Sequence, residues 1–442
     1  MNWLTLRRVA GDLIRVNARY LVDVGQRSRM RDVLRRDGFT PQQQRFVAAE
    51  FAAAPASARP YAGLAATSLT LAGVRVSDAA PAHLNLLIGE VREGGVFAGI
   101  HTALTAAAML AARLQLPLRV VMLDFTSAGN NRAAAERFIR ERFDVAEVTV
   151  IPRETLRGSG FGSRDFWLAT HWKTAHAVQV ACEIGLVGRT RVAYLIQDYE
   201  PGFSPWSTES VLAASTYHAE FIPLVNSTPL WRFLSDQEHL TIDRTQVFAP
   251  DFDEERLRET AQARTRSDIV KVLFYGRPSK HRNLFRLGVS ALSATAAGLG
   301  DDTAVQFFSA GEPHDDIDLG GGHTLMSLGR LAWDDYFAFL SSVSVVLTLQ
   351  QSPHPSHPPF DAAISGAIAI TNDFHQTRGS LHPRIHAVPA STVDLAGALC
   401  AAIRQSAGAT PSEYLPVEDG LLGGRLTDAV DAVASWLNSR RP

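Results

Sequence analysis

Three basic side chains and one side-chain amide lie within a single turn in the second half of the chain. The apolar, strand-like run Val270–Gly276 ends in a glycine and is followed by Arg277, Lys280, Arg282 and Asn283 before a new helical pattern begins. A glycine at the end of a strand lets a ligand approach the backbone closely, and guanidinium groups carry fixed pairs of donors that suit a diphosphate. The turn therefore predicts a phosphate site, with a solvated basic loop as the alternative.

Two later turns could complete such a site. Gly329, Arg330 and Leu331 form a glycine turn between a strand-like run and a helix, which suits backbone contacts to a nucleobase. His357 and Asp361 lie in a proline-rich segment that opens a helix, where unpaired backbone N–H groups attract phosphate oxygens. A carboxylate there can also bind ribose hydroxyls, although complementing the helix dipole is the commoner role of a first-turn acid.

Carboxylates, an imidazole and two indoles follow strand-like runs in the first half of the chain. Asp198 and Glu200 come directly after one such run, His171 and Trp172 precede a helix, and Trp206 lies in a loop. We expect them to face a cleft, where the acids and the imidazole could bind sugar hydroxyls or deprotonate an acceptor, and an indole could stack on a pyranose. For each of the five, the alternative is a helix cap, an interface residue or a buried structural residue.

Two short motifs bear on cofactors. Gly94 and Gly95, followed by Gly99, lie between a strand and a helix, where backbone amides could contact a pyrophosphate or the transferred sugar. Their spacing differs from GxGxxG, which disfavours a dinucleotide site. Asp316 and Asp318 form a DxD pair that could hold Mn²⁺ or Mg²⁺, but they lie in a glycine- and acid-rich loop, so we expect no metal site.

Alternating strand-like and helical patterns from residue 83 onward predict an α/β fold that positions these residues. One series precedes the polar, charge-rich stretch 251–267, which we assign to the linker, and a second series follows it. We therefore expect two Rossmann-like domains whose parallel sheets face each other across a cleft, because ligands of such sheets bind beyond the carboxyl ends of the strands. The predicted boundaries are a helical N-terminal extension (1–80), an acceptor domain (81–255), a donor domain (268–425) and a C-terminal helix that packs back on the first domain (426–442).

The strands and helices of the two series follow from these patterns. Strands are expected at His83–Val91, Arg119–Phe125, Val145–Pro152, Arg191–Tyr199 and Glu220–Ser227, and then at Val270–Gly276, Ala304–Gly311, Thr324–Leu328, Val343–Leu349 and Ala367–Asn372. Helices are expected, among others, at Gly99–Leu114, Arg132–Phe143, Leu284–Ala297, Trp333–Leu340, Pro359–Ser365 and Thr427–Leu437.

Composition narrows the class of protein. The 442 residues are 46% hydrophobic with a formal net charge of −2, which fits a two-domain globular protein and gives no reason to expect a nucleic-acid partner. Cys182 and Cys400 are far apart and lack zinc-type spacing, so neither a disulfide framework nor structural zinc is expected. The chain shows no apolar run of membrane-spanning length and no secretory leader, which favours the cytoplasm.

The first 36 residues are basic, with nine arginines against three aspartates. Apolar residues at roughly helical spacing, including Trp3, Leu6, Leu13 and Tyr20, would form a stripe beside these arginines. Such a helix could lie peripherally on the anionic inner face of the membrane. It could equally pack on the protein or on a partner subunit.

Several segments resemble one family of enzymes. FYGRPSKHRNLF, SLGRLAWDDYFAFL and SPHPSHPPFDAAISGAIAITND resemble, in this order, the donor domain of the GT-B glycosyltransferases of family 4, and most closely its WsaF-like rhamnosyltransferase branch. HLNLLIGEVREGGVFAGIHTALTAA and AYLIQDYEPGFSPWSTESVLAASTY also resemble that branch. The likeness therefore covers roughly residues 80–405.

The resemblance implies roles for particular residues. Arg277 and Arg282 would hold the donor diphosphate and stabilise negative charge on the leaving phosphate, and the turn Gly329–Leu331 would hold the base. Asp361 stands where the broader family has the second, ribose-binding acid of its EX7E motif. Pro353 occupies the position of the first acid, so that acid has no counterpart here.

The resemblance also implies a reaction. A hexose, L-rhamnose in this branch, would pass from a dTDP- or UDP-type nucleotide sugar to a cell-surface polysaccharide or lipid-linked saccharide, with retention of configuration and without a metal or other cofactor. The alternative is a GT-B module that binds glycan or nucleotide in an assembly complex without catalysis. A GT-B sugar-nucleotide epimerase is a third and weaker reading.

Overall fold

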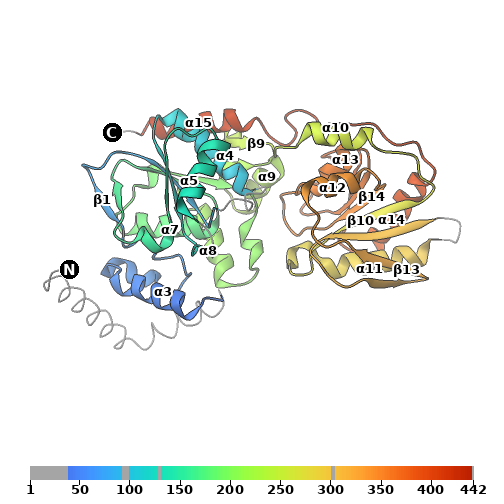
Figure 1. The fold of residues 1–442 in the computed structure, drawn as a ribbon, viewed down its shortest axis with the longest axis horizontal. Coiled ribbons are helices and arrows are strands. Elements are labelled where there is room, and N and C mark those ends of the chain that lie inside the picture. Colours follow the sequence, from blue (N-terminus) through green and yellow to red (C-terminus); the bar gives the residue numbers. More distant parts are fainter. Residues whose placement is uncertain (1–37, 92–98, 128–130, 300–303, 441–442) are drawn as a thin grey trace. The chain divides into compact units, whose positions relative to one another are not determined.

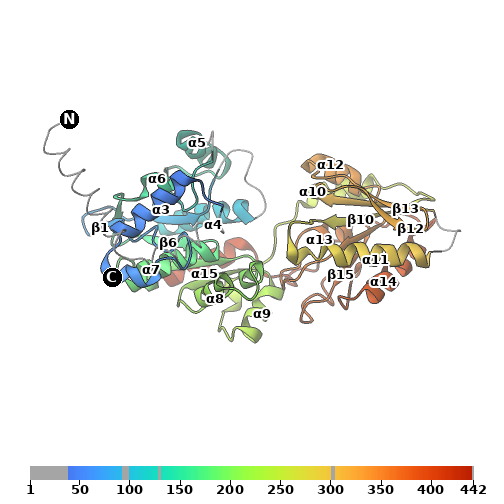
Figure 2. The ribbon, with the colours of Figure 1, turned by 90° about the horizontal axis from the view of Figure 1, so that it is seen from below.

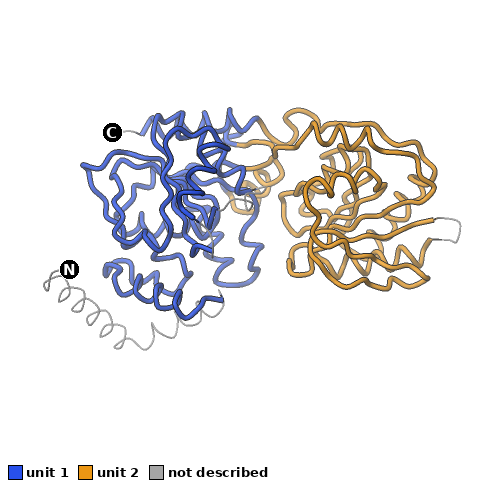
Figure 3. Tube along the Cα trace, viewed as in Figure 1, with its two compact units in different colours: residues 1–225, 240–246, 425–442 blue, residues 226–239, 247–424 orange. Residues whose placement is uncertain are grey.

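The structure is a computed structural model that describes residues 38–91, 99–127, 131–299 and 304–440 (Figure 1). The chain divides into two compact units (Figure 3). Unit 1 contains the described residues up to Val225, Leu240–Gln246 and the described residues from Arg425 on, and unit 2 contains Asn226–His239 and Val247–Gly424. Two seven-stranded sheets organise the chain, which confirms the predicted α/β class with two Rossmann-like domains, the composition of the GT-B class.

The first sheet has the strand order β4-β3-β2-β6-β7-β8-β9, and the neighbours from β4 to β8 pair in parallel. Its strands are β2 (Leu84–Ile88), β3 (Leu118–Met122), β4 (Val148–Ile151), β6 (Phe166–Ala169), β7 (Val192–Ile196), β8 (Ile222–Asn226) and β9 (Val247–Phe248). A separate parallel pair joins β1 (Arg75–Ser77) to β5 (Gly160–Gly162).

Helices precede, connect and cover these strands. They are α3 (Pro41–Ala53), α4 (Gly99–Leu114), α5 (Arg132–Arg142), α6 (Arg153–Leu156), α7 (Trp172–Glu183), α8 (Thr208–Tyr217) and α15 (Leu426–Asn438), with the 3₁₀ turns η1 (Ala56–Tyr61), η2 (Arg189–Arg191), η3 (Glu200–Phe203) and η4 (Arg244–Gln246). The C-terminal helix α15 packs against α4, where the Arg113 Nε and Asp431 Oδ1 atoms lie 2.5 Å apart.

The second sheet has the order β12-β13-β11-β10-β14-β15-β16 and is parallel except for the edge hairpin β12–β13. Its strands are β10 (Val270–Gly276), β11 (Val305–Gly311), β12 (Ile317–Gly320), β13 (His323–Ser327), β14 (Val345–Thr348), β15 (Ile368–Asn372) and β16 (Ile385–Val388). The helices of unit 2 are α9 (Thr228–Gln237), α10 (Glu254–Gln262), α11 (Phe285–Gly298), α12 (Trp333–Leu340), α13 (Pro358–Ile364) and α14 (Thr392–Ser406), with the 3₁₀ turn η5 (His281–Asn283).

Successive residues of β10 and β14 point to opposite faces of the second sheet, and helices bury both faces. Val272 and Phe274 pack in one core with α11 and α14, whereas Leu273 packs in the other with α12 and α13. Figure 2 shows α10 and α12 on one side of this sheet and α11 and α14 on the other. Helix α11 approaches so closely that a Cβ at Gly288 would lie 2.2 Å from the Phe274 ring. This double covering leaves only the strand ends open to ligands.

Two expectations about local structure were wrong. The stretch 251–267 holds the helix α10 within unit 2, with Leu257, Thr260 and Ala261 buried and Asp253 capping its first turn through a bond from the Arg256 N–H. The first sheet also contains β6, a strand that the sequence did not indicate, between β2 and β7.

No helix among the described residues combines the length and the apolar character needed to cross a membrane.

Candidate functional site

The turn after β10 is fastened by a carboxylate that the sequence analysis did not single out. Glu312 accepts hydrogen bonds from the backbone N–H and the hydroxyl of Ser279, at 2.9 and 2.8 Å, and its Oε1 lies 3.7 Å from the Arg277 Nε. Desolvation alone would raise the pKa of Glu312, but the bonds from Ser279 and the charges of Arg277 and Lys280 lower it. Arg277 is therefore oriented by an ionised carboxylate while its side chain stays 27% exposed.

Close packing of two strand ends explains the glycine at the base of this turn. A Cβ at Gly276 would lie 2.2 Å from the Ser309 Oγ on β11, so no larger residue fits without a shift. The same hydroxyl lies 2.8 Å from the His314 Nε2, and that imidazole packs edge-on against Phe285 at the start of α11. The ends of β10 and β11 thus meet in a polar corner at the carboxyl edge of the sheet.

The turn after β10 is joined to the loop after β14. The backbone N–H of Gln351 donates to the carbonyl of Arg282 at 2.7 Å, and the Asn283 Nδ2 donates to the Leu349 carbonyl at 3.2 Å. Asn283 is 2% exposed, and its Oδ1 atom is buried without a hydrogen-bond partner. The turn after β10 and the loop after β14, which were separate candidates in the sequence, are therefore bonded to each other.

A buried arginine fixes the shape of the loop after β14. Arg378 is 1% exposed and donates to the carbonyls of Gln350, Ser352 and Asn372 at 2.8, 2.6 and 2.8 Å. Asn372 adds a reciprocal pair of bonds with the backbone of Gln350. Because backbone groups buried without partners would be costly, this network holds the proline-rich loop in one conformation.

Asp361 is a buried carboxyl group beside a tyrosine. It lies in the first turn of α13, is 7% exposed, and its Oδ2 accepts a bond from the Tyr336 hydroxyl on α12 at 3.2 Å. Burial raises the pKa of Asp361 to about 7, against the lowering effect of the bond from Tyr336. Helix α13 follows the loop after β14, whose Gln351 N–H donates to the Arg282 carbonyl in the turn after β10. Asp361 therefore belongs to the same corner of unit 2 as the turn after β10.

The remaining donor candidates of unit 2 lie around this corner. Gly329 has a positive φ of 62°, and its carbonyl accepts from the Gly311 N–H at 2.9 Å, which ties the turn Gly329–Leu331 to the end of β11. His357 directly precedes α13 with its ring against Phe252, and burial lowers the pKa of His357. Lys280 and Arg330 have exposed side chains.

The DxD pair has structural partners. Asp316 accepts from the Ser327 N–H and Asp318 from the Gly320 N–H, both at 2.8 Å, so each carboxylate stabilises the hairpin β12–β13. No group of three or more potential metal ligands occurs in the part of the chain that the structure describes.

Two of the unit 1 candidates are buried, whereas the sequence analysis expected them to face a cleft. Glu200 is 4% exposed, and its carboxylate accepts from the Trp172 backbone N–H and, at 3.3 Å, from the Tyr194 hydroxyl. The Trp172 side chain is 3% exposed and presents almost no surface for stacking. Both residues stabilise the first turn of α7 from inside the unit.

The other unit 1 candidates lie nearer the surface. The His171 Nδ1 accepts from the Lys173 N–H at 3.2 Å, and burial, helped by the charge of Lys173, lowers the pKa of His171 to about 4. The ring is therefore neutral at pH 7 with its hydrogen on Nε2, which can donate to a sugar hydroxyl. Asp198 accepts from the Tyr199 N–H at 2.8 Å, and Trp206 is fully exposed with φ of 54°.

Gly94 and Gly95 lie outside the described residues, and Gly99 opens α4 with its carbonyl accepting from the Gln197 Nε2 at 2.9 Å.

Family models match both halves of the chain. Residues 83–228 match the model of the WsaF N-terminal domain, and residues 270–400 match that of the WsaF C-terminal domain. The chain carries both domains of the WsaF family. The turn after β10, Glu312, Asp361 and Arg378 all lie in the C-terminal domain, and the α7 cluster lies in the N-terminal domain.

One curated relative and two solved structures are similar to this chain. The O-antigen biosynthesis protein RfbC of Myxococcus xanthus is 30% identical over 282 residues, which are 63% of this chain and only 21% of RfbC. Sucrose-phosphate synthase from Thermosynechococcus elongatus is 13% identical, with a TM-score of 0.49 over 81% of this chain and 95% of that one. HepE from Anabaena, in complex with UDP and glucose, is 14% identical, with a TM-score of 0.47 over 80% and 95%.

The WsaF C-terminal domain contains three polar residues that the sequence analysis missed. Glu312, Tyr336 and Arg378 owe their roles to contacts with residues 33, 25 and 26 positions away, respectively, which no local pattern reports. One signal was available for Glu312, because it follows a strand that ends in glycine, as Arg277 does. No sequence signal distinguishes Arg378 from an ordinary loop arginine.

Proposed function

We propose that the chain is a glycosyltransferase that moves a hexose, L-rhamnose, from a dTDP- or UDP-type nucleotide sugar to a cell-surface polysaccharide or lipid-linked saccharide. Three findings support the proposal: both WsaF domains, a relative named for O-antigen biosynthesis, and the polar corner of unit 2. The chain spans about a fifth of that relative, so the activity is inferred for these domains themselves.

The single observation that carries the proposal is the Asp361 carboxyl group. It is 7% exposed, has a pKa raised to about 7, and forms no ion pair with any described residue. A buried carboxylate without a cation is unfavourable unless hydrogen-bond donors reach it. The two hydroxyls of a ribose would supply such donors, and the neighbouring turn after β10 would receive the diphosphate.

Arg277 and Arg282 have the chemistry required by a reaction without a metal. In the proposed mechanism the acceptor attacks from the face that the leaving diphosphate departs from, and a phosphate oxygen accepts the acceptor proton, so configuration is retained. Fixed guanidinium groups stabilise the charge that grows on this leaving group. Glu312 holds the turn that carries Arg277 in place before the donor arrives.

A transfer assay tests the proposal directly. The full chain is incubated with dTDP-L-rhamnose or UDP-hexoses and saccharide acceptors in excess EDTA, and release of the nucleoside diphosphate is measured. Glycosyl transfer with nucleotide release supports the enzyme. Tight nucleotide binding without any release over many hours supports the alternative, a non-catalytic module in an assembly complex, for which Pro353 in place of the first EX7E acid is the motivating feature.

The proposed acceptor also suggests a location. We propose that the protein works in the cytoplasm, with residues 1–36, which lie outside the described residues, in peripheral contact with the anionic inner face of the membrane. Flotation with phosphatidylglycerol vesicles tests this contact. A full-length chain that stays in the unbound fraction contradicts it.

A further inference from the structure

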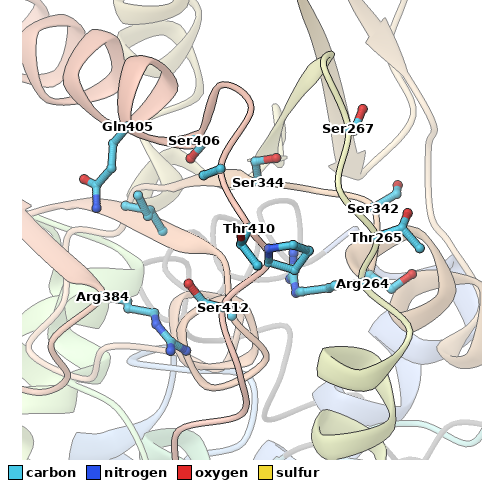
Figure 4. A pocket seen from close by; sticks show the side chains of 15 residues that line it. Arg264, Thr265, Ser267, Ser342, Ser344, Arg384, Gln405, Ser406, Thr410 and Ser412 are labelled. Carbon is cyan, nitrogen blue, oxygen red and sulfur yellow. The ribbon is translucent and has the colours of Figure 1, made fainter.

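A polar cavity lies at the amino-terminal edge of the unit 2 sheet (Figure 4). It has a volume of about 170 Å³, and its walls come from the starts of β14 and β15, the end of α14 and the segment 264–267. The polar corner described above lies at the carboxyl ends of strands in the same sheet. The cavity is therefore a separate site on the opposite edge of the sheet.

Arg264 supplies the first positive charge of this cavity. Its guanidinium donates to the carbonyls of Ser365, Val343 and Leu340, the latter two at 2.5 and 3.1 Å. Leu340 and Ser365 lie at the C-terminal ends of α12 and α13, where each helix presents a partial negative charge of roughly half an elementary charge. One guanidinium thus offsets two helix ends, and the carbonyls that would repel an anion are already bound.

Arg384 supplies a second charge that nothing in the cavity neutralises. One of its nitrogens donates to the Ala363 carbonyl at 3.0 Å, and it forms no ion pair with any described residue. No aspartate or glutamate is among the described residues that line the cavity. Burial lowers the pKa of Arg384 and that of Arg264, and the charge of Arg384 lowers the pKa of Arg264 further, so an anion here would relieve these effects.

Hydroxyl groups complete the set of donors. Ser344, Ser406 and Ser412 line the cavity, and their hydroxyls form no hydrogen bond with the rest of the described chain. In the view of Figure 4, Arg264 and Arg384 lie on either side of the segment that carries Thr410 and Ser412. Guanidinium N–H groups and hydroxyls are the donors that phosphate oxygens accept most readily.

We propose that this cavity binds the phosphate group of a small soluble anion, with Arg384 and the serine hydroxyls as its ligands. Arg264 shields the anion from the helix ends beneath it. The site is distinct from the proposed donor site and does not depend on the proposed function.

Calorimetric titration of the full chain with inorganic phosphate and with pyrophosphate tests the site. Arg384→Gln should weaken binding by about tenfold or more, because a charge-assisted hydrogen bond is lost. Arg404→Gln is the matched control, since Arg404 is an exposed arginine of α14 that donates to Gly298 outside the cavity. Arg277→Ala weakens the proposed donor site, and in that background phosphate should still bind and Arg384→Gln should still weaken that binding, which separates the cavity from the donor site.

A second variant covers the case in which Arg384→Gln does not fold. Ser412→Glu places a carboxylate in the cavity from an exposed position and should abolish phosphate binding while the melting temperature stays constant. Phosphate binding that is unchanged in both variants overturns the proposal, as does binding that disappears only in Arg277→Ala. Binding of phosphatidylglycerol vesicles without binding of free phosphate also overturns it.

Discussion

In unit 1 the carboxylate that follows the strand β7, Glu200, is 4% exposed, and its bonds hold α7 and Tyr194 inside the unit. In unit 2 the guanidinium that follows the central strand β10, Arg277, is 27% exposed, and its Nε lies 3.7 Å from the Glu312 Oε1. Both residues occupy the edge of a parallel sheet where ligands bind. The two residues differ in their hydrogen bonds. Glu200 is bonded inside the unit and supports the fold, whereas Arg277 can contact a ligand.

A charged residue that follows a strand can therefore either support the fold or bind a ligand. In unit 1 a network of Glu200, Tyr194 and Tyr217 satisfies the buried polar atoms internally. In unit 2 the loops bind each other through backbone groups, and the Arg277 side chain stays 27% exposed beside Glu312. The first arrangement predicts effects on stability and the second predicts effects on turnover, which substitutions can distinguish.

Loss of Arg277 should produce the largest effect. Arg277→Ala is expected to lower turnover by about 10²-fold, because one preorganised stabiliser of leaving-group charge is removed. Steady-state kinetics of nucleotide release measure this, with Arg286→Ala, an exposed arginine of α11, as the matched control. Near-normal kinetics for Arg277→Ala would contradict the proposed role of Arg277 in stabilising the leaving group.

Loss of Glu200 should act on stability. Glu200→Ala leaves the Trp172 N–H and the Tyr194 hydroxyl without their acceptor, which costs about 1–3 kcal/mol. Thermal unfolding should show a melting temperature several degrees lower, whereas Glu141→Ala, an exposed residue of α5, should not. An unchanged melting temperature with lost turnover would instead indicate direct contact with substrate.

The raised pKa of Asp361 predicts a pH-dependent effect. The unfolded carboxyl ionises near its reference pKa of 3.8 and the folded one near 7, so the native protein loses stability as pH rises through that window. Asp361→Asn has no carboxyl group at this position and does not lose this stability. The free energy of unfolding of the variant minus that of the unsubstituted protein should therefore rise by up to about 2 kcal/mol as the pH goes from 5 to 7. Asp335→Asn, exposed on α12, is the control, and a difference that does not change with pH contradicts the burial of Asp361.

His171 should give the smallest effect. With a pKa of about 4 and Nδ1 occupied by the Lys173 N–H, the ring stays neutral above pH 5.5. His171→Asn retains a capping acceptor, so the pH dependence of turnover between 5.5 and 8 should keep its shape. Loss of one limb of that profile in the variant would show that His171 titrates during catalysis.

The sequence predicted the elements whose patterns are long and well bounded. β10, α4 and α12 have the predicted bounds, because glycine ends the strand and strongly patterned apolar residues mark the helices. β6 has only four residues and is a strand because β2 and β7 pair with it on either side, which local sequence does not report. α10 was missed although Asp253 and the acids after it are a standard helix start.

The candidate site was predicted in part for the same physical reason. The basic turn after β10 and the first-turn acid Asp361 follow from residue type and local position. Their link through Arg282 and Gln351, the Tyr336 bond and the support from Arg378 depend on contacts between distant segments. Burial of Glu200 and Trp172 likewise depends on the tertiary packing of α7.

Binding of nucleoside diphosphates tests the central claim, that the carboxyl edge of unit 2 receives the donor diphosphate, most directly. Calorimetry with dTDP and UDP on the full chain, on Arg277→Ala and on Arg282→Ala compares the affinities. One of the two nucleotides should bind, and each substitution should weaken its binding by about tenfold or more. Equal affinities of all three proteins for the nucleotide would contradict it.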